Sequence, residues 1–326
     1  MVRFLFTAIT LGLALHAGVV LGAEEARPPA EYPAKPIRFI VPYLAGGPQD
    51  LLARVMGAKL LEAWGQPVIV DNRTGANGTI ACQTTAHSPR DGYTIQIGSV
   101  ATHAMNPALY KNLPYDPIKD FAPITQVGYT PRIGVAHPSV QAGTVKELIA
   151  LAKTKRLTYG SPGVGSAAHL AGELFKTMAG VDLVHVPYKG GVAATADLLG
   201  GRLALTFGNI LNSLPHMNSG KLKAIGITST KRLSILPDVP AIAETLPGYE
   251  VILWWGIFAP AGTPRPIVDK LNREIVKIIG EPELKQRWAD EGTVLLGSSP
   301  DEFAAFVKAE HQRWAPIVEK SGAREE

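Results

Sequence analysis

The sequence VPYLAGGPQD, residues 41–50, decides the fold that we expect for this chain. It joins an apolar run, residues 37–43, to a helical pattern of apolar residues over 50–64. An apolar run bounded by proline and glycine is typical of a strand that is buried on both faces. A shorter version, VPYKGG at residues 186–191, follows a second apolar run and precedes a second helical pattern. The repetition predicts two α/β lobes that present similar loops.

Strand and helix patterns alternate along the rest of the chain. Further strands are predicted in QPVIVDNR, YTIQIGS, LTYGS, DLVHVPY, LALTFGN and LKAIGITS, and most of them are separated by a helical pattern. Three amphipathic helical patterns then follow in residues 266–320. Alternation of this kind predicts two mainly parallel sheets that are covered by helices on both faces.

Two long apolar segments are expected to cross between the lobes. They are residues 122–139 and 249–264, and both are interrupted by glycine and proline. We therefore predict that lobe 1 contains residues 32–128 and 254–326, and that lobe 2 contains residues 129–253. The C-terminal helices would then return to pack on lobe 1.

The N-terminus is typical of a cleaved signal peptide, which we assign to residues 1–23. A short basic start with Arg3 precedes an apolar run over residues 4–21, and small residues end at Ala23. This order is that of a secretory signal. The alternative is an uncleaved membrane anchor, because the run is nearly long enough to span a bilayer. Cleavage is favoured because a polar, proline-rich sequence follows at once.

Composition excludes several classes of function. The net charge of +4 falls close to neutral once Arg3 is removed, and no basic run is interleaved with aromatic residues, so no nucleic-acid partner is expected. Cys82 is the only cysteine, so no disulfide can form within the chain. The histidines occur singly, without the spacing of metal ligands, and no metal site is predicted.

Signatures of enzymes and cofactors are weak or missing. The residues GVGSAA at 163–168 match a dinucleotide-binding pattern, but Asp182 begins the next predicted strand, whereas the ribose-binding acid should end it. The sequence contains no P-loop, no G-x-S-x-G and no H-E-x-x-H. We predict a protein that is not an enzyme and that uses no cofactor.

The first glycine loop has the chemistry of an anion site. Gly46 and Gly47 allow a ligand to approach the backbone, and Pro48 suits the first position of a helix. Gln49 and Asp50 fall in the first turn, where free N–H groups favour an anion. Asp50 itself is expected to stabilise the helix start. An ordinary strand-to-helix turn is the alternative for the whole loop.

A second loop of this kind spans residues 159–169. Ser166 is a good N-cap, and the small residues before it leave N–H groups free at a helix start. His169 would lie in the first turn and face either solvent or ligand. A structural role for this histidine is the alternative.

A family resemblance is carried by several segments in a fixed order. They are YPAKPIRFIVPYLAGGPQDLLAR, GQPVIVDNRTGANGTI, PRDGYTIQIGS, NPALYKNLPYDPIKDFAPIT, HLAGELFKTMAGVDLVHVPYKGG, LPDVPAIAE, LPGYE and APAGTP. From about residue 32 to the C-terminus, the chain resembles the Bug-type (TctC-like) receptors, the substrate-binding proteins of tripartite tricarboxylate transporters.

The resemblance implies a fold, a location and partners. The fold would be the type II, Venus-flytrap periplasmic binding protein, with two lobes that close on a small organic acid. That acid would be a mono- or dicarboxylate, aromatic acids included. The protein would be a periplasmic monomer that delivers the acid to integral-membrane transporter subunits. The alternatives are a sensor subunit that binds the same acids and a secreted hydrolase or isomerase.

The resemblance also implies which residues bind the ligand. Backbone N–H groups would hold one carboxylate without a dedicated arginine, and Tyr43 and Tyr188 would flank the body of the ligand. Gln49 stands where the family often has Ser or Thr, and Gly208 stands where an acid or Ala is common, so the ligand itself is not identified. The predicted ligand-binding residues are Tyr43, Ala45, Gly46, Gly47, Gln49, Asp50, Ser99, Ser161, Gly163, Gly165, Ser166, His169, Tyr188, Gly190 and Asn209.

Overall fold

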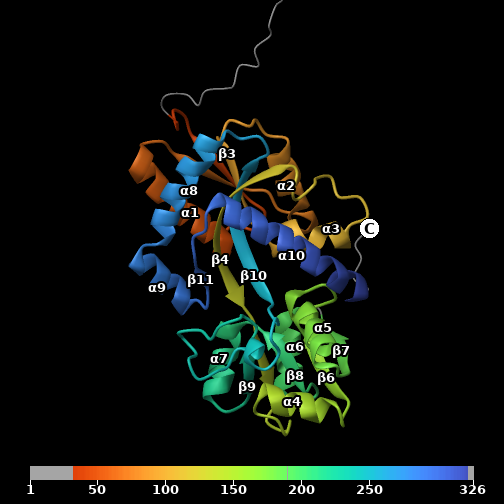
Figure 1. Cartoon of the computed structure of the whole chain (residues 1–326). Helices are drawn as coiled ribbons and strands as arrows, with labels where there is room; N and C mark the ends of the chain where they lie inside the picture. The colour runs from red at the N-terminus through yellow and green to blue at the C-terminus, as the bar shows by residue number, and fades with distance from the viewer. Residues whose placement is uncertain (1–31, 189, 322–326) are drawn as a thin grey trace, which may run out of the picture.

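The computed structural model describes residues 32–188 and 190–321, and Figure 1 shows two lobes joined by long strands. The predicted signal peptide, residues 1–23, lies outside the described residues. Within the described ranges, no helix is both long and apolar enough to cross a membrane.

Lobe 1 is built on a six-stranded mixed sheet with the order β11-β4-β10-β3-β1-β2. Its strands are β1 (Ile37–Val41), β2 (Val68–Asn72), β3 (Thr94–Ser99), β4 (Phe121–Pro131), β10 (Ile252–Pro260) and β11 (Val294–Leu295). Its helices are α1 (Pro48–Trp64), η1 (Ala76–Gly78), α2 (Thr79–Ala86), η2 (Ala101–Met105), α3 (Asn106–Leu109), α8 (Arg265–Ile279), α9 (Pro282–Asp290) and α10 (Pro300–Ser321).

Lobe 2 is built on a five-stranded sheet with the order β7-β6-β8-β5-β9. Its strands are β5 (Ile133–Ala136), β6 (Leu157–Ser161), β7 (Leu183–Pro187), β8 (Leu205–Gly208) and β9 (Lys223–Ile227). Its helices are α4 (Val145–Ala152), α5 (Ala167–Ala179), α6 (Gly191–Leu199), α7 (Ile210–Asn218) and η3 (Ile242–Glu244).

The two-lobed α/β fold predicted from the sequence is confirmed, but both sheets are mixed rather than mainly parallel. In lobe 1, β1 is parallel to β2 and β3, whereas β10 is antiparallel to β3 and β4. In lobe 2, β6 is parallel to β7 and β8, whereas β5 is antiparallel to β8 and β9. The reason is the crossing of the chain. Strand β10 returns from lobe 2 and so opposes β4, and β5 enters lobe 2 and so opposes β8.

The crossing strands form the hinge. Strand β4 ends at Pro131 and β5 begins at Ile133, so Arg132 alone separates the two sheets along this pass. The backbone N–H of Arg132 donates to Thr228 Oγ1 at 2.7 Å, and its carbonyl accepts from the Thr228 N–H at 2.9 Å. On the returning pass, the N–H of Val251 donates to the Thr228 carbonyl at 2.8 Å. Thr228 therefore ties the two passes together. The lobe boundaries predicted from the sequence fall inside β4 and β10.

Helix α10 crosses from one lobe to the other (Figure 1). It packs on β4 and α3 of lobe 1 and on α5 of lobe 2. Its buried Glu310 accepts hydrogen bonds from Nε1 of Trp254 and of Trp314, both at 2.9 Å. This contact fixes α10 against β10, the strand that returns from lobe 2.

Candidate functional site

The strand directions place the carboxyl ends of both sheets toward each other. Strands β3 and β4 are both antiparallel to β10, so β3 and its parallel neighbour β1 run in the same direction as β4. Strand β4 leads into lobe 2. Strands β6 and β8 oppose β5, which leads away from lobe 1. The loops after β1, β3, β6 and β8 therefore lie at the facing edges. Open α/β sheets bind ligands at this edge.

The lobe 1 loop after β1 is closed by its own hydrogen bonds. The Gly46 N–H donates to Asp50 Oδ2 at 2.8 Å, and the Gly47 N–H donates to the Leu44 carbonyl at 3.3 Å. Gly46 has a φ of +81°, which favours glycine. The two glycine amides predicted to hold a ligand are thus engaged within the loop. The first-turn amides of Gln49 and Asp50 donate to no described residue and are the free donors here.

Asp50 serves this loop rather than an open site. Its side chain is 1 % exposed and accepts hydrogen bonds from Gly46, from Arg54 Nε at 2.9 Å and from Asn72 Nδ2 at 2.9 Å. Burial alone would raise the pKa of Asp50, but these bonds outweigh it and lower the pKa to about 2. The carboxylate therefore stays ionised and places a negative charge at the α1 start.

Tyr43 and Ser99 meet at the same edge of lobe 1. The Tyr43 hydroxyl and Ser99 Oγ are 2.7 Å apart, because β1 and β3 are neighbouring parallel strands. Burial raises the pKa of Tyr43. Ala45 lies at the exposed tip of the loop. Two of the predicted residues are thus in direct contact, and Ala45 lies two residues after Tyr43 in the chain.

The lobe 2 loop after β6 is also closed internally. The Gly163 N–H donates to Ser161 Oγ at 3.1 Å, and the Gly165 N–H donates to His169 Nδ1 at 3.1 Å. Ser166 caps α5, because its Oγ accepts from the His169 N–H at 3.3 Å and donates to the Gly163 carbonyl at 2.7 Å. As in lobe 1, the glycine amides shape the loop. In the first turn of α5, the amides of Ala167 and Ala168 donate to no described residue, whereas the amide of His169 is taken up by the cap.

His169 stacks on His185 behind this loop. The ring centroids are 4.1 Å apart with an interplanar angle of 28°. His185 Nε2 lies 2.7 Å from Ser161 Oγ. Burial, with a smaller contribution from His169, lowers the pKa of His185 to about 4, and burial also lowers the pKa of His169. Both rings are therefore neutral near pH 7 and support the loop by packing and hydrogen bonding.

The residues of the second VPY sequence and the glycine that follows tie α6 to the loop after β6. The Tyr188 hydroxyl donates to Asp197 Oδ2 at 2.7 Å, and the Gly190 N–H donates to the Pro162 carbonyl at 3.3 Å. Asn209 caps α7, since its Oδ1 accepts from the Asn212 N–H at 3.2 Å. Three helix starts, those of α5, α6 and α7, thus converge near the carboxyl ends of β6 and β8.

A cavity of about 600 Å³ opens between these helix starts and the hinge. Among the residues predicted from the sequence, Asn209 alone lines it. The cavity is lined by Arg132, Pro162, Ala168, Gly191, Val192, Ala194, Thr195, Ala196, Leu199, Thr206, Phe207, Gly208, Asn209, Asn212, Ser213 and His216.

The sequence analysis missed Arg132 and Asn212. Arg132 did carry a signal, because it is the only charged residue in the apolar segment 122–139. Asn212 carried none that distinguishes it from an ordinary surface residue.

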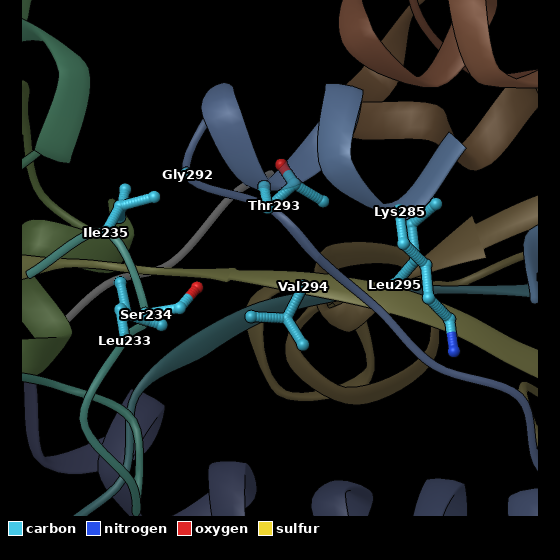
Figure 2. Close-up of a pocket in the computed structure, with 9 residues that line it drawn as sticks. Leu233, Ser234, Ile235, Lys285, Gly292, Thr293, Val294 and Leu295 are labelled. Atoms are coloured by element: carbon cyan, nitrogen blue, oxygen red, sulfur yellow. The ribbon is translucent and has the colours of Figure 1, made fainter. Parts of the chain in front are cut away.

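A smaller cavity of about 190 Å³ lies between the lobe 2 loop at Leu233–Ile235 and the α9–β11 connection of lobe 1 (Figure 2). Its wall is mostly apolar, with Leu233, Ile235 and Val294, and Lys285 is its only charged residue. The connection through Gly292 follows the carboxyl end of α9, where the amides of Gly292 and Thr293 donate to the Ala289 and Trp288 carbonyls. The polar side chains that line it are Ser234, Lys285 and Thr293. No group of three or more potential metal ligands occurs among the described side chains.

Comparison with known proteins identifies the family. The model of the tripartite tricarboxylate transporter family receptor (TctC) matches residues 52–323. The protein BugT of Bordetella pertussis is 37% identical over 297 residues, which cover 90% of this chain and 91% of BugT.

Solved structures of similar proteins share the fold. The structure of Rpa4515 from R. palustris with adipate has 37% identity and a TM-score of 0.70, and the match covers 89% of this chain and 98% of that one. A TctC solute-binding protein from Polaromonas, without ligand, has 27% identity and a TM-score of 0.80, with 89% and 99% covered. The chain belongs to the tripartite tricarboxylate transporter family of receptors.

Proposed function

We propose that this protein is a periplasmic solute-binding protein that captures a small organic acid between its lobes and passes it on unchanged. The observation that carries the proposal is the set of unpartnered first-turn amides at facing strand ends. They belong to α1 in lobe 1 and to α5, α6 and α7 in lobe 2. Helix starts carry a partial positive charge, so together they favour a carboxylate.

The class of ligand is supported by the relatives. Rpa4515 is described with adipate, a small dicarboxylate. We propose a mono- or dicarboxylate for this chain as well, aliphatic or aromatic. Gln49 of lobe 1 and Asn209 of lobe 2 are side chains of the predicted set that can add hydrogen bonds beside the amides.

Closure of the lobes is the proposed mode of binding. The hinge would lie at Arg132 and Val251, where the two passes meet at Thr228. The chain superposes better on the ligand-free Polaromonas receptor than on the adipate-bound protein, although its identity to the latter is higher. This difference is expected if the lobes stand apart here and approach each other around a ligand.

Delivery to integral-membrane transporter subunits is proposed from membership of the family. A periplasmic sensor subunit would bind the same acids. Isolation of the membrane partner from cells that contain the full-length tagged protein separates the two: transporter subunits support delivery, and a signalling receptor supports sensing.

A hydrolase is disfavoured by the geometry of its best candidate. Ser161 and His185 are in hydrogen-bond contact, as a nucleophile and a base would be. However, Ser161 has no exposed surface, and a histidine with a pKa of about 4 is a weak base at neutral pH. No carboxylate among the described residues accepts a hydrogen bond from the His185 ring.

The proposal is tested by a thermal-shift screen of the mature protein against organic acids, amides and amino acids. Tm should rise with the concentration of particular acids, as mass action requires. Each acid that binds is then incubated with the protein and analysed by mass spectrometry. Unchanged acid supports a receptor. Either a flat screen or a converted acid would contradict the proposal.

A further inference from the structure

Arg132 occupies an unusual position for a charged residue. It lies at the hinge between β4 and β5, with its backbone held by Thr228, and its side chain lines the lobe 2 cavity. The side chain is partly buried, and its Nε is fully buried with no hydrogen-bond partner. A buried charge normally requires both a counter-charge and hydrogen bonds.

No counter-charge is supplied by the described part of the chain. None of its acidic residues forms an ion pair with Arg132, and burial alone lowers the pKa of the guanidinium. Glu250, which precedes the hinge residue Val251, pairs instead with Arg313, and so does the buried Glu310.

The cavity around Arg132 is suited to an anion. Among the described residues, its lining contains no aspartate or glutamate, and His216 is the only other titratable one. Gly191 and Val192 bring the first-turn amides of α6, which donate to no described residue. Asn209 and Asn212 bring side-chain amides at the start of α7. A full positive charge, two helix starts and neutral polar groups thus surround the same space.

We infer that Arg132 is a ligand-binding residue that pairs with an anionic group of the ligand in the lobe 2 cavity, so that the protein selects dicarboxylates over acids with one charge. This inference rests on the proposed function and deepens it. The second carboxylate would then meet the first-turn amides of Gln49 and Asp50 in lobe 1. A planar guanidinium matches a carboxylate with two parallel hydrogen bonds, which a lysine cannot reproduce.

The test compares each diacid with its monoamide and with its neutral diamide. Succinate, adipate, suberate and terephthalate, with these derivatives, are titrated into the mature protein by calorimetry. The wild type should prefer at least one diacid to its monoamide. Arg132→Gln should weaken that diacid by roughly 30-fold or more, because it removes one partner of a buried charge pair. It should weaken the diamide, which has no carboxylate to pair with the guanidinium, by less than about threefold. Arg132→Lys should retain an intermediate affinity.

A ligand-free measurement separates binding from structure. Arg132→Gln should leave Tm at or above that of the wild type, because it removes an uncompensated buried charge. Arg156→Gln is the matched control, since Arg156 is exposed in lobe 2 and outside this cavity.

Two results would overturn the inference. One is a fall of several degrees in Tm for Arg132→Gln but not for Arg156→Gln, which would show a structural role. The other is equal weakening of the diacid and its neutral diamide. If the wild type binds no acid at all, the proposed function fails, and the ligand-free comparison still decides whether Arg132 is structural.

Discussion

Two loops begin with Pro-Tyr and continue to a pair of glycines, at residues 42–47 in lobe 1 and 187–191 in lobe 2. The charges around these two loops are opposite in sign. In lobe 1, Asp50 lies in the first turn of α1 and puts a buried negative charge beside the helix start. In lobe 2, the first turns of α6 and α7 contain no acid, and Arg132 lines the same cavity as these helix starts. Both lobes therefore repeat the arrangement of strand, glycine loop and helix, but the charge beside the helix start is negative in lobe 1 and positive in lobe 2. Selectivity should therefore come mainly from lobe 2, with lobe 1 supplying a weaker anion site.

The largest effect is expected from removing the acid that organises lobe 1. Asp50→Ala leaves the Gly46 amide, Arg54 and Asn72 without their acceptor. The free energy of unfolding should fall by about 2–3 kcal/mol, since these are hydrogen bonds to a buried charge. Urea unfolding measures this loss. Asp182→Ala, at an exposed position, is the control and should change little. Equal stability of the two variants would mean that Asp50 does not organise the loop.

Giving lobe 2 an acid of its own should weaken binding. Asn212→Asp places a carboxylate on the wall that Arg132 also lines. It would compete with the ligand for the guanidinium, so the affinity for a diacid should fall about tenfold, or about 1.4 kcal/mol. Asn212→Ala is the control without the charge. If both variants lose affinity equally, the effect comes from loss of the Asn212 amide and not from the carboxylate introduced by Asn212→Asp.

The two loops should respond to acid in different pH ranges. The pKa of His185 in the folded protein, about 4, lies below its ordinary value, so the unfolded chain binds more protons as the pH drops below about 6.5. The stability that neutral His185 contributes is present above that pH and is lost as the pH falls toward 4. Asp50 also has a lowered pKa, about 2, so its contribution persists until the pH falls below about 3.8.

Hydrogen exchange from pH 7.5 to 4.5 measures this difference, after correction for the intrinsic exchange rate. The loop at residues 161–169 should lose protection, and the loop at residues 43–50 should keep it. His185→Gln should reduce the pH dependence in lobe 2. Parallel loss in both loops would contradict the assignment of the histidines.

The smallest effect is expected at the two tyrosines. Tyr43→Phe removes the contact with Ser99, and Tyr188→Phe removes the bond to Asp197. Each should lower the free energy of unfolding by about 0.5–1.5 kcal/mol. The loss should be larger for Tyr43, because its partner Ser99 is buried whereas Asp197 also pairs with exposed Arg202. The reverse order in chemical denaturation would show that the lobe 2 loop is the more tightly held.

The sequence predicts the strands and helices of the α/β fold well because their signals are local. Apolar runs, glycine pairs and N-caps such as Ser166 each report on a few neighbouring residues, and the structure forms strands and helices there. The direction of the strands is harder to predict, since the antiparallel pairs of β5 and β10 follow from the crossing of the chain between the lobes. That crossing belongs to the tertiary fold, and no short segment of sequence reports it.

The candidate site was harder to predict for a physical reason. A glycine-rich loop shows that amides are present, but only coordinates show that Gly46 and Gly165 donate within their own loops. Likewise, Arg132 stands alone in an apolar run, and the sequence cannot show that no acid reaches it. The stacking of His169 on His185 joins a helix to a neighbouring strand, which spacing along the chain does not reveal.

Helix α10 has a consequence for how the lobes can move. Its end packs on α5 near Pro316 and Leu174, while its middle is fixed to β10 through Glu310. Rotation at the hinge must therefore be accompanied by sliding of α5 along this helix. Packed helices slide by small steps between preferred side-chain arrangements, so the approach of the lobes should be limited to a few discrete angles. The C-terminal helix would then set the range of opening, although it lies outside the ligand cavity.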